Sequence, residues 1–181
     1  DRNIVSLPAE KVKLIREKGD RTIKFLTLDQ IEKLILAPKT STITGLRDRA
    51  ILESLFSTGA RIAELVNLNR DQIKITPATK DLEISIVGKG SHIRTVYFSN
   101  RAVVAIKEYM ATREDKEKAL FISYKGPRKR ESRRLSPRTI ETLVKRYALI
   151  SGSPITTNSS LIVRAVWFTN SRSCSLSMWA E

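Results

Sequence analysis

Cysteine and histidine are nearly absent from this 181-residue chain, which contains one of each, Cys174 and His92. A single cysteine excludes a disulfide within the chain and is typical of proteins that work in a reducing cytoplasm. One histidine and one cysteine are also too few for the usual kinds of zinc site, so we expect no bound metal.

Long apolar runs are missing as well. No stretch approaches the roughly 20 apolar residues that a helix needs to cross a bilayer, so we expect no membrane-spanning segment. Residues 1–20 are highly charged and lack the apolar core of a signal peptide. Together with the single cysteine, these features favour a cytoplasmic location.

Acidic residues are scarce relative to basic ones. The 33 Lys and Arg residues outnumber the 19 Asp and Glu residues, which gives a formal net charge of +14. A charge this large on a chain long enough for about one domain indicates a polyanionic partner, most simply nucleic acid, with an acidic membrane surface as the alternative. Aromatic residues make up only 6% of the chain, which argues against stacking on single strands and favours duplex DNA.

The pattern of apolar residues predicts a mainly α-helical fold with a small three-stranded antiparallel sheet. Thr27 and Gln30 form a capping box that opens a short helix, and Pro38 ends it. Ser136 followed by Pro137 opens another helix that stops near 152. The remaining expected helices cover 46–57, 61–69 and 100–113, and the expected strands cover 73–76, 82–87 and 92–98.

The most informative stretch is 57–64, where an apolar helix runs into a Thr-Gly turn and a second helix starts at Arg61. Gly59 permits the sharp bend between the two helices. Arg61 is therefore expected at a helix N-terminus, where backbone N–H groups favour an anion. A guanidinium at that point can clamp a phosphate through two hydrogen bonds.

A second signal follows about 25 residues later, where the sequence predicts a hairpin with Lys89 at its tip between Gly88 and Gly90. Departure of the 5′ oxygen from a phosphodiester requires fixed cations around the phosphate and a proton donor near the leaving oxygen. An arginine after a glycine turn and a lysine on a hairpin together fit the front half of such a site.

The segment Thr58-Gly59-Ala60-Arg61-Ile62-Ala63-Glu64-Leu65, followed by Val87-Gly88-Lys89-Gly90 and Arg94, resembles the catalytic domain of the tyrosine site-specific recombinases, or integrases, of the Xer type. The resemblance covers roughly residues 22–155. It implies the mainly helical fold of that domain and the breaking and rejoining of duplex DNA through a 3′-phosphotyrosine, without metal or other cofactor. It also implies self-assembly into a tetramer, because recombination of two duplexes needs four active sites.

The resemblance assigns a role to each matching residue. Arg61 would be the first catalytic arginine, Lys89 the general acid for the 5′ oxygen, and Glu64 a supporting residue that orients its neighbours. The simpler alternatives are a surface arginine that pairs with Glu64 and a solvated lysine in a turn. His92 and Arg94, on the same hairpin, are expected to contact the DNA backbone, although either could instead be a surface or packing residue.

A basic loop and the helix that follows it are the other expected DNA contacts. The segment 125–134 carries six positive charges, and the exposed face of the next helix adds Arg138 and Lys145. A solvated run of charges is the alternative for the loop. The loop residues assigned to DNA binding are Arg128, Lys129, Arg130, Arg133 and Arg134.

The second half of the family's active site is missing from the sequence. The family pattern requires His-x-x-Arg and later a nucleophilic tyrosine, but Arg164 is the only arginine near the expected position and Leu161 stands where the histidine belongs. No tyrosine follows Tyr147. We therefore treat Arg164 as a doubtful second catalytic arginine and expect the chain to bind DNA without cutting it.

The domain organisation follows from these patterns and from composition. We expect an interdomain linker over 1–21, an incomplete catalytic domain over 22–157, and an atypical tail over 158–181 that is frameshifted or foreign. Charge falls abruptly after 152, and an N-terminal DNA-clamping domain found in the family is absent, so the chain is expected to be a truncated recombinase. The rival hypothesis is a non-catalytic basic protein that shares the fold and only binds duplex DNA.

Overall fold

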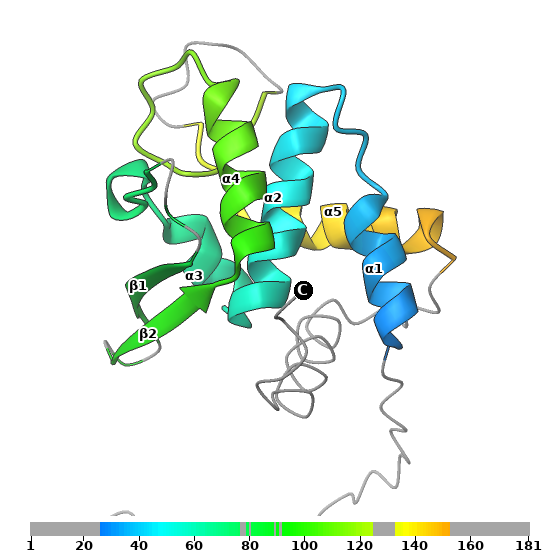
Figure 1. The fold of residues 1–181 in the computed structure, drawn as a ribbon, viewed down its shortest axis with the longest axis horizontal. Helices are drawn as coiled ribbons and strands as arrows, with labels where there is room; N and C mark the ends of the chain where they lie inside the picture. The colour runs from blue at the N-terminus through cyan, green and yellow to red at the C-terminus, as the bar shows by residue number, and fades with distance from the viewer. Residues whose placement is uncertain are drawn as a thin grey trace, which may run out of the picture.

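The computed structural model describes residues 26–76, 79, 81–88, 90, 92–124 and 133–152. In this part of the chain the fold is mainly helical with a small antiparallel sheet, as the sequence predicts (Figure 1). The elements in chain order are α1 (Leu28–Leu36), α2 (Ile43–Thr58), α3 (Ile62–Asn67), the 3₁₀-helix η2 (Arg70–Gln72), β1 (Leu82–Val87), β2 (Ile93–Phe98), α4 (Asn100–Ala111) and α5 (Pro137–Ile150).

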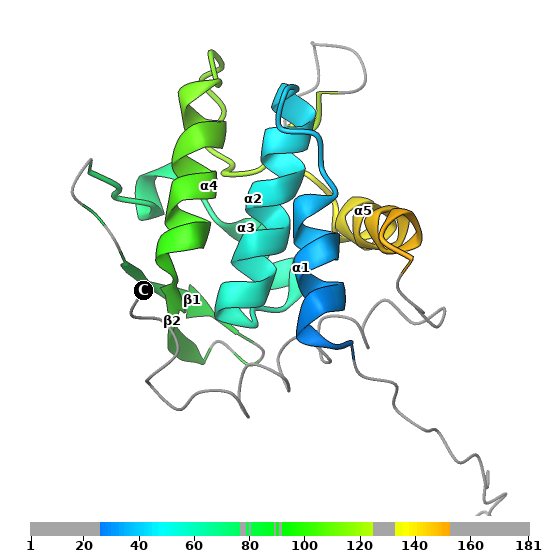
Figure 2. The same cartoon turned by 45° about the vertical axis from the view of Figure 1, so that its right-hand side comes forward.

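Helix α2 occupies the middle of the fold. It lies alongside α4 on one side and α1 on the other, and the β1–β2 hairpin lies at the end where α2 leads into α3 (Figures 1 and 2). Helix α5 runs across this layer rather than along it and packs against α1 and α3. Since α2 is covered from several directions, its buried positions include charged residues as well as apolar ones.

The helix starts confirm the capping signals in the sequence. Thr27 Oγ1 accepts a hydrogen bond from the backbone N–H of Gln30, and the Gln30 side chain accepts one from the N–H of Thr27. At α5, Ser136 Oγ accepts from the N–H of Thr139, and Pro137 occupies the first turn. These bonds satisfy backbone donors that have no partner within the helix, so both ends are fixed locally.

The sheet differs from the prediction, because the described residues form two strands and not three. β1 and β2 pair in antiparallel register from Leu82 opposite Phe98 to Val87 opposite Ile93. The expected strand over 73–76 does not form, because its N–H groups bond locally. Ile73 donates to the carbonyl of Arg70, Ile75 to that of Ile73, and Thr76 to the hydroxyl of Thr79.

The first turn of α2 passes very close to the loop before it. Thr42 caps the helix by accepting a hydrogen bond from the N–H of Gly45. A Cβ atom built on Gly45 would lie 1.8 Å from the carbonyl oxygen of Lys39, which is backbone and cannot rotate away. Glycine is therefore required here by a close approach of two backbone segments.

Replacement of this glycine gives a test of the loop–helix packing. A Gly→Ala change inside a helix ordinarily stabilises a protein, by about 0.5–1 kcal/mol. We predict the opposite sign for Gly45→Ala, a loss of about 1–3 kcal/mol in the free energy of unfolding, because the loop or the helix must shift. Urea denaturation measures the difference, and an unchanged or higher stability would contradict the packing described.

Candidate functional site

The turn between α2 and α3 places Arg61 at the N-cap of α3, directly before its first helical residue. Gly59 ends α2 in the left-handed conformation, with φ of 57°, and its N–H donates to the carbonyl of Leu55. Thr58 Oγ1 accepts from the N–H of Ala60 and donates to the carbonyl of Ser54. This bend is the one expected from the Thr-Gly pair, and it directs the Arg61 side chain toward the β1–β2 hairpin.

Glu64 joins two arginines from different elements, and we call Arg61, Glu64 and Arg94 the Glu64 cluster. Arg61 Nη1 donates to Glu64 Oε1 at 2.8 Å, and Arg94 Nη2 donates to Glu64 Oε2 at 2.7 Å. The Glu64 side chain is only 6% exposed, whereas those of Arg61 and Arg94 are 64% and 39% exposed. A buried carboxylate thus holds two guanidinium groups that both still reach solvent.

Glu64 also accepts a hydrogen bond from the backbone N–H of Arg61, the donor expected from the sequence to bind an anion. The N–H of Arg61 donates to Glu64 Oε2 at 2.8 Å, so the start of α3 is capped by the chain's own carboxylate. The pairing of Arg61 with Glu64 was the simpler alternative for this arginine. In the structure Arg61 makes that pair through one nitrogen and keeps most of its side chain exposed.

The same contacts determine the ionisation of Glu64. Burial raises the pKa of this carboxyl, but hydrogen bonds from the Arg61 N–H, the Arg94 guanidinium and the Arg61 guanidinium together hold the pKa below its ordinary value. Glu64 therefore stays ionised at neutral pH. A general base would need a raised pKa, so the geometry favours an orienting role for Glu64 over a proton-accepting one.

The hairpin turn lies directly against the Glu64 cluster. A Cβ atom on Gly88 would come within 3.3 Å of Glu64 Oε1 and 3.8 Å of Arg61 Nη1, so a larger residue there would press on the cluster. The N–H of Gly88 donates to the carbonyl of His92 across the turn. Lys89 follows Gly88 in the chain, although Lys89 itself lies outside the described residues. His92 is exposed beside this turn.

The sequence alone leaves the role of Arg94 open, and the structure shows it as a partner of Glu64. One signal in the sequence indicates its direction, because side chains two apart along a strand share a face. Arg94 stands opposite Ile86 and shares a face of β2 with the buried residues Val96 and Phe98. Arg94 Nε is buried and has no hydrogen-bond partner among the described residues.

The other basic residues assigned to DNA fall into three groups. Arg138 and Lys145 are exposed on α5. Arg133 and Arg134 are instead engaged with the protein: Arg133 Nε donates to the carbonyl of Ser123, and Arg134 donates to carbonyls at the end of α3 and to the Asn69 side chain. Those outside the described residues are Arg128, Lys129 and Arg130, and the doubtful second catalytic arginine, Arg164, also lies outside them.

Two further findings, on metal sites and on membrane-spanning helices, apply to the described part of the chain. No group of three or more His, Cys, Asp or Glu side chains there is placed to hold a metal ion. No helix there is long and apolar enough to cross a membrane.

Comparison with known proteins gives consistent matches. Residues 24–160 match the model of the phage integrase family. A tyrosine recombinase XerC of Thermodesulfovibrio yellowstonii is 35% identical over 138 residues, which cover 71% of this chain and 42% of the relative. The crystal structure of XerA recombinase superposes with a TM-score of 0.67 at 21% identity, covering 88% of this chain and 53% of that one.

A fourth match is a structure of a XerH site-specific recombinase bound to a palindromic difH substrate, in a post-cleavage complex, with a TM-score of 0.64 at 19% identity. It covers 83% of this chain and 43% of that chain. At this identity the two structural matches establish the shared fold. The chain spans about half the length of the proteins that it matches.

The ionised state of Glu64 gives a pH-dependent prediction. Because its folded pKa is below the ordinary value of 4.5, its stabilising contribution is complete above pH 4.5 and is lost as the pH falls through the folded value. At pH 7, Glu64→Gln should lower the free energy of unfolding by about 1–3 kcal/mol, and this gap should narrow below pH 4.5.

Urea denaturation of both proteins from pH 7 to pH 3 measures that gap. Glu83→Gln, on the exposed face of β1, controls for the change in net charge. A gap that is absent at pH 7, or that widens in acid, would show that the two arginines do not stabilise the Glu64 carboxylate.

Proposed function

The chain belongs to the phage integrase family, and on that premise we propose that it is the catalytic domain of a Xer-like tyrosine recombinase, which breaks and rejoins duplex DNA. The observation that carries the proposal is the Glu64 cluster beside the hairpin turn. It is a preorganised pair of cations on a basic chain, beside Gly88, the residue that precedes Lys89 in the sequence.

In this proposal Arg61 binds the phosphate that is attacked. One nitrogen of its guanidinium is held by Glu64, and the side chain is largely exposed, so the remaining N–H groups can bond two non-bridging phosphate oxygens. Charge that builds on those oxygens during attack is then met by donors already in place. Lys89 protonates the departing 5′ oxygen, and Arg94 supports the same carboxylate from the other side.

Contacts with the DNA backbone extend beyond the reacting phosphate. Arg138 and Lys145 are seven residues apart on α5, and residues seven apart lie on one face of a helix, so both can follow a phosphate strand. The segment 125–130 adds four more basic residues. We propose duplex DNA as the partner and further copies of this domain as the other members of a recombination tetramer.

Two of the tyrosines that precede the tail, Tyr109 and Tyr147, are poor candidates for the nucleophile. Burial raises the pKa of Tyr109 and of Tyr147, and both hydroxyls are hydrogen-bonded, that of Tyr109 to Tyr124 and that of Tyr147 to Asp48. Since no tyrosine follows Tyr147 in the sequence, we propose that this 181-residue polypeptide binds DNA without forming the covalent intermediate. The unusual composition after 157 is proposed to reflect a shifted reading frame.

DNA binding by the 181-residue chain is the most direct prediction of the proposed function. A protein that neutralises six to ten phosphates loses about 10³–10⁵ in affinity between 50 and 200 mM salt. We expect the affinity for duplex DNA to fall by about that factor over the same salt range. Binding to single strands of the same length should be weaker, and fluorescence anisotropy measures both affinities. A salt-independent affinity, or a preference for single strands, would contradict the proposed interface.

Catalysis is tested in a protein that carries the missing half of the site. The encoding DNA is first read in all frames past codon 150, and any frame with His-x-x-Arg and a later tyrosine is restored. Arg61→Ala should then reduce covalent protein–DNA adduct by at least about 100-fold while duplex affinity changes little. Arg101→Ala, an exposed arginine on α4, is the matched control.

Unchanged adduct formation by Arg61→Ala would show that Arg61 does not bind the attacked phosphate. If no frame carries those residues, or if the restored protein forms no adduct, the non-catalytic DNA-binding protein is the better description. That alternative keeps the fold and the basic surface and removes the chemistry. The adduct is visible as a band of reduced mobility on a denaturing gel, so binding and cleavage are measured separately.

A further inference from the structure

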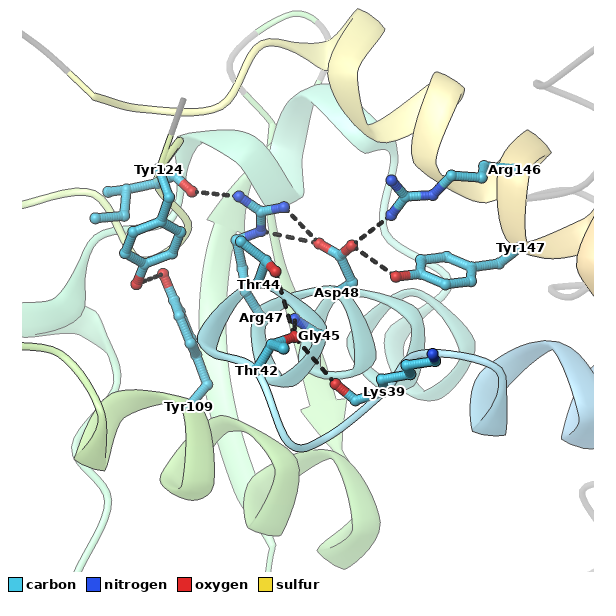
Figure 3. Close-up of polar contacts among 11 residues, drawn as sticks. Lys39, Thr42, Thr44, Gly45, Arg47, Asp48, Tyr109, Tyr124, Arg146 and Tyr147 are labelled. Carbon is cyan, nitrogen blue, oxygen red and sulfur yellow. Dashed lines mark hydrogen bonds and ion pairs between the residues drawn. The ribbon is translucent and has the colours of Figure 1, made fainter. Parts of the chain in front are cut away.

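A second buried carboxylate, Asp48 of α2, lies away from the Glu64 cluster and takes no part in the proposed chemistry. It is 1% exposed and accepts hydrogen bonds from three side chains (Figure 3). Oδ1 accepts from Arg47 Nε and Nη2, at 2.9 and 2.6 Å. Oδ2 accepts from Arg146 Nη2 at 2.8 Å and from the Tyr147 hydroxyl at 2.9 Å.

The two oxygens of Asp48 face different parts of the fold. Arg47 belongs to α2 and also donates through Nη1 to the carbonyl of Ile122, which fixes it to the segment before the basic loop. Arg146 and Tyr147 both belong to α5, 98 and 99 residues further along the chain. One carboxylate therefore ties α5 to α2, with Arg146 also lying over the Tyr147 ring at 4.6 Å.

The hydrogen bonds from α5 to Asp48 matter because side-chain packing leaves a cavity between α5 and the start of α2. Apolar side chains of α5 pack toward α1 and α3, but a cavity of about 510 Å³ lies between α5 and the α1–α2 corner. Its lining includes Lys39, Thr42, Leu143 and Ile150, together with Arg146 and Tyr147. The bonds from Arg146 and Tyr147 to Asp48 link α5 to α2 beside this cavity, which all three residues line.

The residues of α5 that reach Asp48 are next to those proposed to reach DNA. Lys145 directly precedes Arg146, and Arg138 lies two turns earlier on the same face as Lys145. A rotation or shift of α5 would therefore displace both proposed phosphate contacts together. Removal of one partner from a buried ion pair leaves an uncompensated charge, so this link has one strongly preferred arrangement.

We propose that Asp48 is a positioning residue that fixes α5 in the orientation needed for duplex DNA binding. The inference rests on the proposed function, in which Arg138 and Lys145 of α5 contact phosphates. Asp48 does not touch DNA. Its carboxylate sets the position of the helix that does.

The test is Asp48→Asn in the 181-residue chain, with affinity measured by fluorescence anisotropy on a labelled random-sequence duplex of about 30 base pairs. The change removes a negative charge from a basic chain, so simple electrostatics predicts tighter binding. Positioning predicts the opposite, about tenfold weaker binding and a salt slope smaller by about 0.9 for each phosphate that α5 no longer neutralises.

Glu53→Gln is the matched control. Glu53 is also an acid of α2, is 2% exposed and pairs with an arginine, but that arginine is Arg101 of α4 and not a residue of α5. The control makes the same change in charge at the same depth. It should lower the thermal midpoint without weakening DNA binding or changing the salt slope.

A double-mutant cycle separates positioning from a general loss of stability. Asp48→Asn should have little further effect on affinity when Arg138→Ala and Lys145→Ala are already present, because the contacts that it displaces are gone. Equal effects in both backgrounds, or affinity equal to that of the unmodified chain, would overturn the inference. Should Asp48→Asn fail to fold, Tyr147→Phe removes a single bond and must weaken binding about threefold, and an unchanged affinity would overturn the inference equally.

The same variants distinguish failure of this inference from failure of the proposed function. If Arg138→Ala with Lys145→Ala leaves the affinity for DNA unchanged, α5 does not contact DNA. Both the proposed DNA interface on α5 and the positioning role of Asp48 are then wrong. If that pair weakens binding while Asp48→Asn does not, the interface stands and only the positioning role is wrong.

Discussion

The pairing of a buried carboxylate with arginines from other elements is the interaction on which this structure depends. A carboxylate withdrawn from water is tolerated only when opposite charge and hydrogen bonds replace its hydration, so each pair has few alternative arrangements. Each acid lies on α2 or α3, and each reaches at least one arginine on another element. The pairs are Glu64 with Arg94, Asp48 with Arg146, and Glu53 with Arg101.

This arrangement reconciles a stable fold with a strongly basic surface. A chain with a formal charge of +14 repels itself, yet a DNA-binding surface requires its arginines to face outward. In each pair the acid is buried and the partner arginine remains partly exposed. The buried carboxylate thus fixes the position and direction of the arginine side chain, while the guanidinium stays partly exposed to solvent. In the proposed function, Glu64 in this way orients the Arg61 guanidinium before the substrate phosphate arrives, as preorganised catalysis requires.

Sequence patterns predicted the features that depend on neighbours in the chain. The capping bonds of Thr27 and Ser136 and the bend at Gly59 involve residues within about one helical turn, so the signals are local and the structure confirms them. The expected strand over 73–76 failed for a related reason. Its alternating pattern is local, but a strand also needs a partner, and these amides bond within their own turn.

The buried charges could not be predicted in the same way. Arg47-Asp48-Arg49 has the composition of a solvated helix face, and the α5 residues that bind Asp48 lie about a hundred positions away. One signal was available in the sequence. The apolar residues of α2 are spread around the helix and are not confined to one face, which indicates a helix that is covered from several sides. The partner of Arg94 could not be predicted either. The alternation of residues along the strand places Arg94 on the buried face, but only the folded chain identifies Glu64 as its partner.

In the proposed function Glu64 presents Arg61 to a DNA phosphate, and a crystal structure of this chain with a duplex oligonucleotide would show that contact. We expect a phosphate oxygen within about 2.7–3.0 Å of an Arg61 nitrogen, with the Arg61–Glu64 and Arg94–Glu64 bonds unchanged. A duplex bound to another face, or an Arg61 that leaves Glu64 and makes no phosphate contact, would rule out this role of Glu64 and Arg61.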